Sequence, residues 1–91
     1  MFEELLTSRS RAKIIEFLMG SPDKEYYLRE ISRQLSLNPR STHIELKRLN
    51  KMGLLKSRRS GNSLYFQADP DFLFYDEILS IVRKSGERAV H

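Results

Sequence analysis

Basic side chains gather in one short stretch of this sequence. Residues 40–59 contain seven lysines and arginines and a single acid, Glu45, although the whole chain of 91 residues carries a net charge of only +4. Ammonium and guanidinium groups bind phosphate oxygens through charge-assisted hydrogen bonds. Charge of one sign concentrated in one segment is therefore the pattern expected of a surface that binds a polyanion such as nucleic acid. The alternative is a solvated helix face, which is what most charge runs are.

The chain lacks the residues that metal binding or catalysis would need. The chain has no cysteine and only two histidines, His43 and His91, which is too few for a convincing zinc site. It contains no glycine-rich phosphate loop and no recognisable pairing of a nucleophile with a base. We therefore expect no enzyme activity, no cofactor and no bound metal. Without a long apolar run or a secretory signal, the protein is expected to be soluble and cytoplasmic, with no membrane partner.

Apolar spacing and capping residues divide the chain into elements. Asn38-Pro39 can begin a helix, Gly53 can end one, and after Gly53 the apolar period changes from that of a helix to that of a strand. The sequence predicts, in order, a helix over 8–19, a strand over 25–27, helices over 28–36 and 39–52, strands over 54–59 and 63–67 joined at Ser60-Gly61-Asn62, and a helix over 70–84.

This order of elements is that of a winged helix-turn-helix. We therefore expect a mainly α fold with a small β-hairpin wing, built as one domain over residues 1–91. Its core should span about 8–84, and residues 85–91 should form a frayed tail.

The helix over 39–52 has two different faces when its residues are placed at 100° intervals. The face expected to pack is made of Thr42, Leu46 and Leu49. The opposite face is expected to be basic and exposed, and consists of Arg40, Ile44, Lys47 and Lys51, flanked by His43 and Arg48. A helix with such a face suits the major groove of B-DNA.

The exposed residues are expected to divide their work. Arg40 and Ser41, in the first turn, can contact base edges, and Ile44 can contact a thymine methyl group unless it is simply an exposed apolar residue. Contacts with phosphates are expected from Lys47, Arg48 and Lys51, and His43 either donates to DNA or stays exposed. The hairpin can contact the DNA backbone or minor groove through Lys56, Arg58, Arg59 and Asn62. A charged edge that prevents strand aggregation is the alternative for these hairpin residues.

The stretch YYLREISRQLSLNPRSTHIELKRLNKMGLLKSRRSGNSLYFQADP resembles the winged-helix regulators of the ArsR-like and MarR-like superfamily, especially small prokaryotic members. The resemblance implies a DNA-binding transcriptional regulator that works as a homodimer, with its third helix in the major groove. Thr42 and Ile44 depart from the usual pattern of the reading helix, so a sequence preference cannot be carried over. Metal-sensing members commonly use cysteine, which this chain lacks, so no metal sensor is carried over either.

Two further expectations concern partners. The last helix carries two apolar rows, and one of them can form a two-fold interface together with the N-terminal apolar residues. The residues assigned to this interface are Phe2, Leu5, Leu6, Phe74, Tyr75, Ile78, Leu79 and Val82. The alternative is that the small domain buries both rows itself. The runner-up function is a winged helix used for contact with another protein, or an accessory subunit of a nucleotidyltransferase-type partner. No pocket for a small effector is legible.

Overall fold

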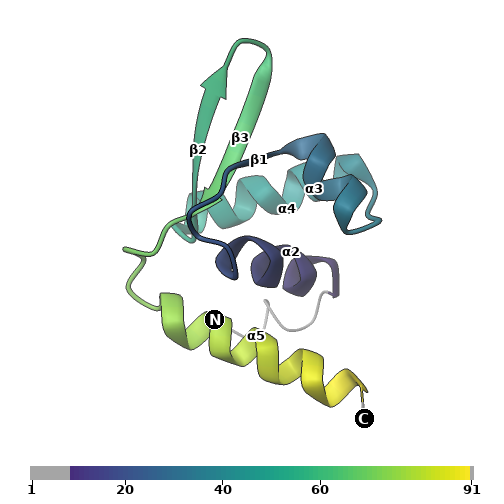
Figure 1. The fold of residues 1–91 in the computed structure, drawn as a ribbon, viewed down its shortest axis with the longest axis vertical. Helices are drawn as coiled ribbons and strands as arrows, with labels where there is room; N and C mark the ends of the chain where they lie inside the picture. The colour runs from purple at the N-terminus through teal and green to yellow at the C-terminus, as the bar shows by residue number, and fades with distance from the viewer. Residues whose placement is uncertain (1–8, 91) are drawn as a thin grey trace.

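In the computed structural model of this chain, the backbone is described for residues 9–90 and the side chains for residues 9–84. The elements follow the predicted order and form a winged-helix fold (Figure 1). In chain order they are α2 (Arg9–Met19), β1 (Tyr26–Tyr27), α3 (Leu28–Gln34), α4 (Pro39–Met52), β2 (Leu55–Ser60), β3 (Ser63–Ala68) and α5 (Tyr75–Val90).

The start and end of α4 confirm the signals read from the sequence. The side-chain oxygen of Asn38 accepts hydrogen bonds from the backbone N–H groups of Arg40 at 2.8 Å and Ser41 at 3.2 Å. Pro39 occupies the first helical position, where an N–H group would have had no partner inside the helix. Gly53 ends the helix with a φ of 100°, in the left-handed region that favours glycine. Local chemistry therefore sets both ends of this helix.

The three strands form one antiparallel sheet in the order β1-β3-β2, and β2 and β3 make the wing. Ser60 pairs with Ser63, so the turn between them contains only Gly61 and Asn62 and is one residue shorter than expected. Gly61 has a φ of 60°, which a tight hairpin turn requires. Figure 1 shows the wing projecting from one end of the domain, while α5 lies at the other end.

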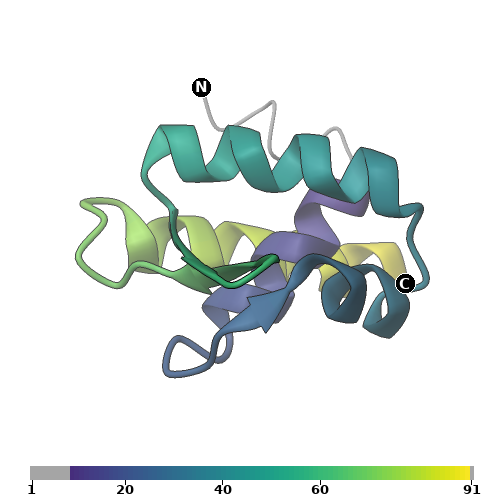
Figure 2. The ribbon, with the colours of Figure 1, turned by 90° about the horizontal axis from the view of Figure 1, so that it is seen from above.

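The core lies between the helices and the inner face of the sheet, and α2 lies between α5 and the α3–α4 pair in Figure 1. Its buried apolar side chains are Ile14, Ile15, Leu18, Met19, Ile31, Leu46, Leu49, Leu54, Leu55, Phe66, Ala68, Ile78 and Val82. Thr42 is also buried, and its hydroxyl donates to the backbone oxygen of Asn38 at 2.8 Å. Figure 2 shows α4 along one side of the domain, so the helix can bury one face and leave the other to solvent.

Three helix boundaries differ from the prediction. Asp69 and Pro70 were expected to begin the last helix, but the side chain of Asp69 accepts from the backbone N–H of Asp71, and residues 70–74 form turns. This local bond satisfies the start signal without a helix, so α5 begins only at Tyr75. At its other end α5 continues to Val90, through most of the segment expected to fray. Helix α3 ends at Gln34, two residues earlier than expected.

The apolar residues of α5 correct the prediction of two separate rows. Ile78 and Val82 are each only 1% exposed and belong to the domain's own core, so they are not available to a partner. Tyr75 donates its hydroxyl to the backbone oxygen of Met19, and Leu79 also packs against the core. These four α5 residues form one helical stripe at i, i+3, i+4 and i+7, which explains why they are buried together.

The remaining residues assigned to the interface are one exposed residue, Phe74, and three N-terminal residues. Phe74 is 37% exposed, next to Leu73 at 79%, so of the five predicted positions on α5 and its approach it is the one most open to a partner. The other predicted positions, Phe2, Leu5 and Leu6, lie outside the described residues.

Candidate nucleic-acid interface

The two faces predicted for α4 are present. Thr42, Leu46 and Leu49 are buried, and the opposite side of the helix is open to solvent. The open side carries Arg40, Ile44, Lys47 and Lys51, and Ile44 is 49% exposed. From residue 40 to residue 51 this row is about 16 Å long at the rise of an α-helix. An exposed basic helix of this size can enter the major groove of B-DNA, which is about 12 Å wide.

The residues beside this row differ in how freely they can reach a ligand. Ser41 is exposed in the first turn of α4. Arg48 is 63% exposed, and one of its nitrogens lies 3.5 Å from a carboxylate oxygen of Glu45. His43 is partly buried because it faces the wing. Arg48 and His43 therefore flank the basic row, as the helical spacing predicted. Arg48 also lies next to Glu45, and His43 also faces the wing.

An ion pair ties the middle of α4 to the first described helix. Nε of Arg11 in α2 lies 2.6 Å from Oε2 of Glu45, and Nη2 of Arg11 donates to Oε1 at 3.3 Å. Their side chains are only 14% and 13% exposed. Glu45 is the single acid of α4, and this contact holds its carboxylate against α2 instead of on the basic row. No pattern in the sequence predicted this pair, because its partners are 34 residues apart.

The wing residues separate onto the two faces of the hairpin. Arg59 pairs in register with Leu64, two residues from the Ser57–Phe66 pair, so these side chains share one face of the hairpin. Asn50 of α4 donates to the hydroxyl of Ser57 at 3.2 Å, which identifies this face as the one turned toward α4. Arg59 therefore belongs to the α4 side of the wing.

Lys56 and Arg58 alternate with these residues and lie on the other face. Arg58 donates from two nitrogens to the carboxylate of Glu25, at 2.9 Å each, and its guanidinium lies 5.0 Å from the ring centre of Tyr65. The hydrogen bond from Arg58 holds the pKa of Glu25 below its usual value. The charge of Arg58 is therefore compensated by Glu25 and faces away from α4.

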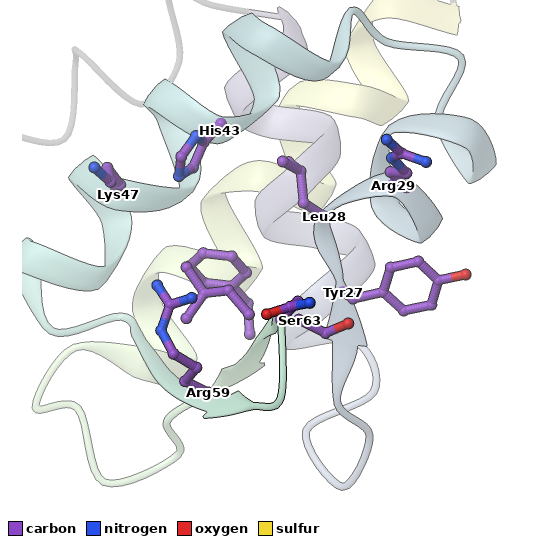
Figure 3. Close-up of a pocket in the computed structure, with 10 residues that line it drawn as sticks. Tyr27, Leu28, Arg29, His43, Lys47, Arg59 and Ser63 are labelled. Atoms are coloured by element: carbon purple, nitrogen blue, oxygen red, sulfur yellow. The ribbon is translucent and has the colours of Figure 1, made fainter.

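A hollow of about 550 Å³ separates α4 from the wing, and we call it the helix–wing hollow (Figure 3). It is lined by Tyr27, Leu28, Arg29, His43, Lys47, Arg59, Asn62, Ser63, Leu64 and Phe66. Figure 3 shows His43 and Lys47 on one side of the opening, Arg59 on another, and Arg29 beyond Leu28. None of its lining residues is acidic, so positive charge dominates this hollow.

Arg29 is a residue that sequence reasoning did not select. The helical period marked Arg29 only as a residue on the solvent side of its helix. In sequence it is 14 positions from His43, the nearest α4 residue that lines the hollow, so no local pattern connects the two. In residues 9–84 we find no group of histidine and acidic side chains that could hold a metal ion. Within the described part of the chain, no helix has the length and apolar character that a membrane span requires.

Comparison with known proteins finds a sequence match to part of one regulator. No family model matches the chain. Over 68 residues it is 31% identical to an uncharacterized HTH-type transcriptional regulator, MJ1398 of Methanocaldococcus jannaschii, in a match that covers 75% of this chain and only 17% of that protein.

Two solved structures share the fold. The AntR antimony-specific transcriptional repressor superposes with a TM-score of 0.73 at 19% identity, over 97% of this chain and 76% of AntR. Rv0081 of Mycobacterium tuberculosis superposes with a TM-score of 0.69 at 25% identity, over 98% of this chain and 85% of Rv0081. MJ1398 and AntR are both named as transcriptional regulators. The chain therefore has the winged helix-turn-helix fold of these structures and resembles, over 68 residues, part of one HTH-type transcriptional regulator.

Proposed function

We propose that this chain binds double-stranded DNA in a sequence-specific manner and regulates transcription as a homodimer. The observation that carries the proposal is the exposed basic row of α4, which lies opposite a buried apolar stripe on the same helix. Helix α4 enters the major groove, and the α4-facing side of the wing follows the adjoining backbone. The sequence match to MJ1398 and the fold shared with AntR support a role in regulation.

The α4 residues have separate tasks in this proposal. Arg40, Ser41 and Ile44 face the bases, because the first turns of a reading helix point into the groove. Phosphates are contacted by Lys47 and Lys51 further along the helix. Arg48 makes a weaker contribution to the phosphates, since Glu45 lies 3.5 Å from its guanidinium.

The wing contributes only part of the set expected from the sequence. Arg59 and Asn62 line the helix–wing hollow and can reach the backbone. Lys56 and Arg58 lie on the other face of the hairpin, and Arg58 is engaged by Glu25. The proposed interface therefore leaves out Lys56 and Arg58.

A homodimer would place two copies of α4 on one face of the duplex, with half-sites separated by about 34–36 Å, one helical turn of DNA. The exposed side chains of Leu73 and Phe74 beside α5 supply apolar surface for the contact between copies. AntR is specific for antimony, but this chain has no cysteine to provide a soft thiolate ligand. We therefore do not extend that specificity to this chain.

Selection of bound duplexes from a random pool tests DNA binding, palindromy and half-site spacing in one experiment. We expect an enriched pseudo-palindrome, and affinity should fall with salt at a log–log slope of about −0.9 per phosphate neutralised. Arg40→Ala should relax the selected sequence, whereas Lys47→Ala with Lys51→Ala should weaken all duplexes alike. Lys13→Ala, on the exposed side of α2, is the matched control for loss of charge. A pool without enrichment, bound without salt dependence, would contradict the proposal.

Contact with another protein is the second candidate, and the exposed apolar side chains of Met52, Leu73 and Phe74 favour it. Such a module would not need an exposed basic row on α4. The same selection separates the two candidates, because a protein-binding module gives no enriched duplex and its binding to DNA is not changed by Arg40→Ala.

A further inference from the structure

The bases around the helix–wing hollow differ from Arg48 and Arg58 nearby because their charges are not compensated by an acid. In residues 9–84, the ion pairs involve Arg11, Arg48 and Arg58, each bound to a glutamate. Arg29, Lys47 and Arg59 make no ion pair within that described range. Unpaired cations on the surface of a protein attract anions, and here three of them border one hollow.

These bases come from three different elements, and the fold brings them together. His43 and Lys47 are four residues apart on α4, so they lie on the same side of that helix. Arg59 is on the face of β2 that the Asn50–Ser57 hydrogen bond turns toward α4. Arg29 lies at the start of α3 and borders the hollow beyond Leu28 (Figure 3). An anion in the hollow would therefore meet positive charge from more than one direction.

The polar groups and the floor of the hollow narrow the class of ligand. Asn62 and Ser63 add an amide and a hydroxyl that can donate hydrogen bonds, while Leu64 and Phe66 form an apolar floor. A phosphate group presents oxygens in several directions and can accept from arginine, lysine and histidine at once. A carboxylate offers only two oxygens in one plane, which a single arginine already satisfies. Donors on three sides of the hollow therefore fit phosphate better than carboxylate.

We propose that the helix–wing hollow is a phosphate site, in which Lys47, His43 and Arg59 hold one phosphate group and Arg29 adds charge from the opposite side. The phosphate is either part of a DNA backbone or part of a small phosphate ester. The DNA source rests on the proposed function: with α4 in the major groove and the wing at the next minor groove, the strand between the grooves crosses this hollow. The ester source does not depend on DNA binding.

The first arm of the test uses inorganic phosphate and records amide and side-chain NMR shifts of the full chain. Phosphate should shift signals of His43, Arg59 and Asn62, with acetate at equal ionic strength as the comparison ion. Arg59→Gln and Lys47→Gln should each weaken phosphate binding about fivefold to tenfold, since each removes one charge-assisted contact. Lys56→Gln removes the same charge as Lys47→Gln, but on the far face of the wing, and should change binding less than twofold.

The second arm uses duplexes from the selection in which single phosphates are replaced by uncharged methylphosphonates. One such position, on the strand between the two contacted grooves, should weaken binding of the unmodified protein about tenfold. The same replacement should have little further effect on Arg59→Gln, because both changes remove the same contact. If inorganic phosphate binds in the hollow but no methylphosphonate position weakens DNA binding in this way, the site belongs to a small phosphate ester. If one position weakens DNA binding but inorganic phosphate does not bind, the site belongs to the DNA backbone.

The two proposals fail in different ways. If DNA is bound but neither arm responds to Arg59→Gln or Lys47→Gln, the phosphate site is refuted and the DNA-binding function remains. If no duplex is selected but phosphate binds in the hollow, the function is refuted and the site remains. Phosphate shifts that map to another surface, or acetate shifts of equal size, also overturn the site. All three glutamine variants change exposed side chains, so unchanged circular dichroism melts confirm that they fold.

Discussion

Removal of Arg11 is the perturbation for which the structure gives the clearest magnitude. Two nitrogens of Arg11 contact the carboxylate of Glu45, and both side chains are about seven-eighths buried. Breaking a fully buried ion pair by deleting one partner costs about 3–5 kcal/mol, because the other charge is left without compensation. Arg48 stays 3.5 Å from the same carboxylate and the pair is not fully buried. We therefore expect Arg11→Met to lower the free energy of unfolding by about 2 kcal/mol.

Thermal unfolding followed by circular dichroism measures this cost. For a domain of this size, about 4–8 °C of melting temperature corresponds to 1 kcal/mol, so Arg11→Met should melt roughly 10 °C below the unmodified protein. Lys13→Met, which changes an exposed base on the same helix, should stay within about 0.5 kcal/mol. The double variant Arg11→Met with Glu45→Met should recover most of the loss, since replacing a buried pair by apolar side chains is often close to neutral.

Two results would refute this reasoning. If Arg11→Met melts at the temperature of Lys13→Met, then the contact between α2 and α4 does not stabilise the fold. If the double variant loses as much as the two single variants added together, Arg11 and Glu45 are not coupled. DNA affinity should fall in Arg11→Met as well, because the freed carboxylate of Glu45 lies beside the basic row of α4 and repels phosphates.

Three further predictions follow from local geometry. Gly53→Ala should lower the free energy of unfolding by about 1–2 kcal/mol, because φ is 100° and a Cβ would lie 3.3 Å from Phe72; an unchanged urea midpoint would contradict this strain. Asn38→Ala should cost about 1 kcal/mol in the same assay through loss of the helix cap, and Asn38→Ser should restore most of it. The pair of Glu25 with Arg58 lowers the pKa of Glu25, so its stabilising contact is present above the usual carboxyl pKa and is lost as the pH falls through the lowered value. NMR titration of the Glu25 carboxyl carbon checks this, with Arg58→Gln expected to return the pKa to its usual value; an unshifted titration in the unmodified protein would refute it.

The order of the elements and both faces of α4 could be predicted from the sequence alone. Asn38, Pro39 and Gly53 act on the backbone next to them, so the ends of α4 were predictable without knowledge of the rest of the fold. The helical period likewise separated the buried stripe from the basic row, because that separation depends only on 3.6 residues per turn. The last helix was less predictable, since the side chain of Asp69 satisfies a neighbouring backbone N–H in a turn as readily as in a helix cap.

Which bases have an acidic partner depends on the tertiary structure. Contacts between residues far apart in the chain pair Arg11 with Glu45 and Arg58 with Glu25, and neither spacing is local enough to be read from a pattern. The burial of Ile78 and Val82 also depends on the tertiary structure, because the apolar stripe of α5 packs against α2. The seven bases of residues 40–59 are therefore one run in sequence but not one surface. The fold neutralises some of them, turns others away and gathers Lys47 and Arg59 with Arg29 around a single hollow.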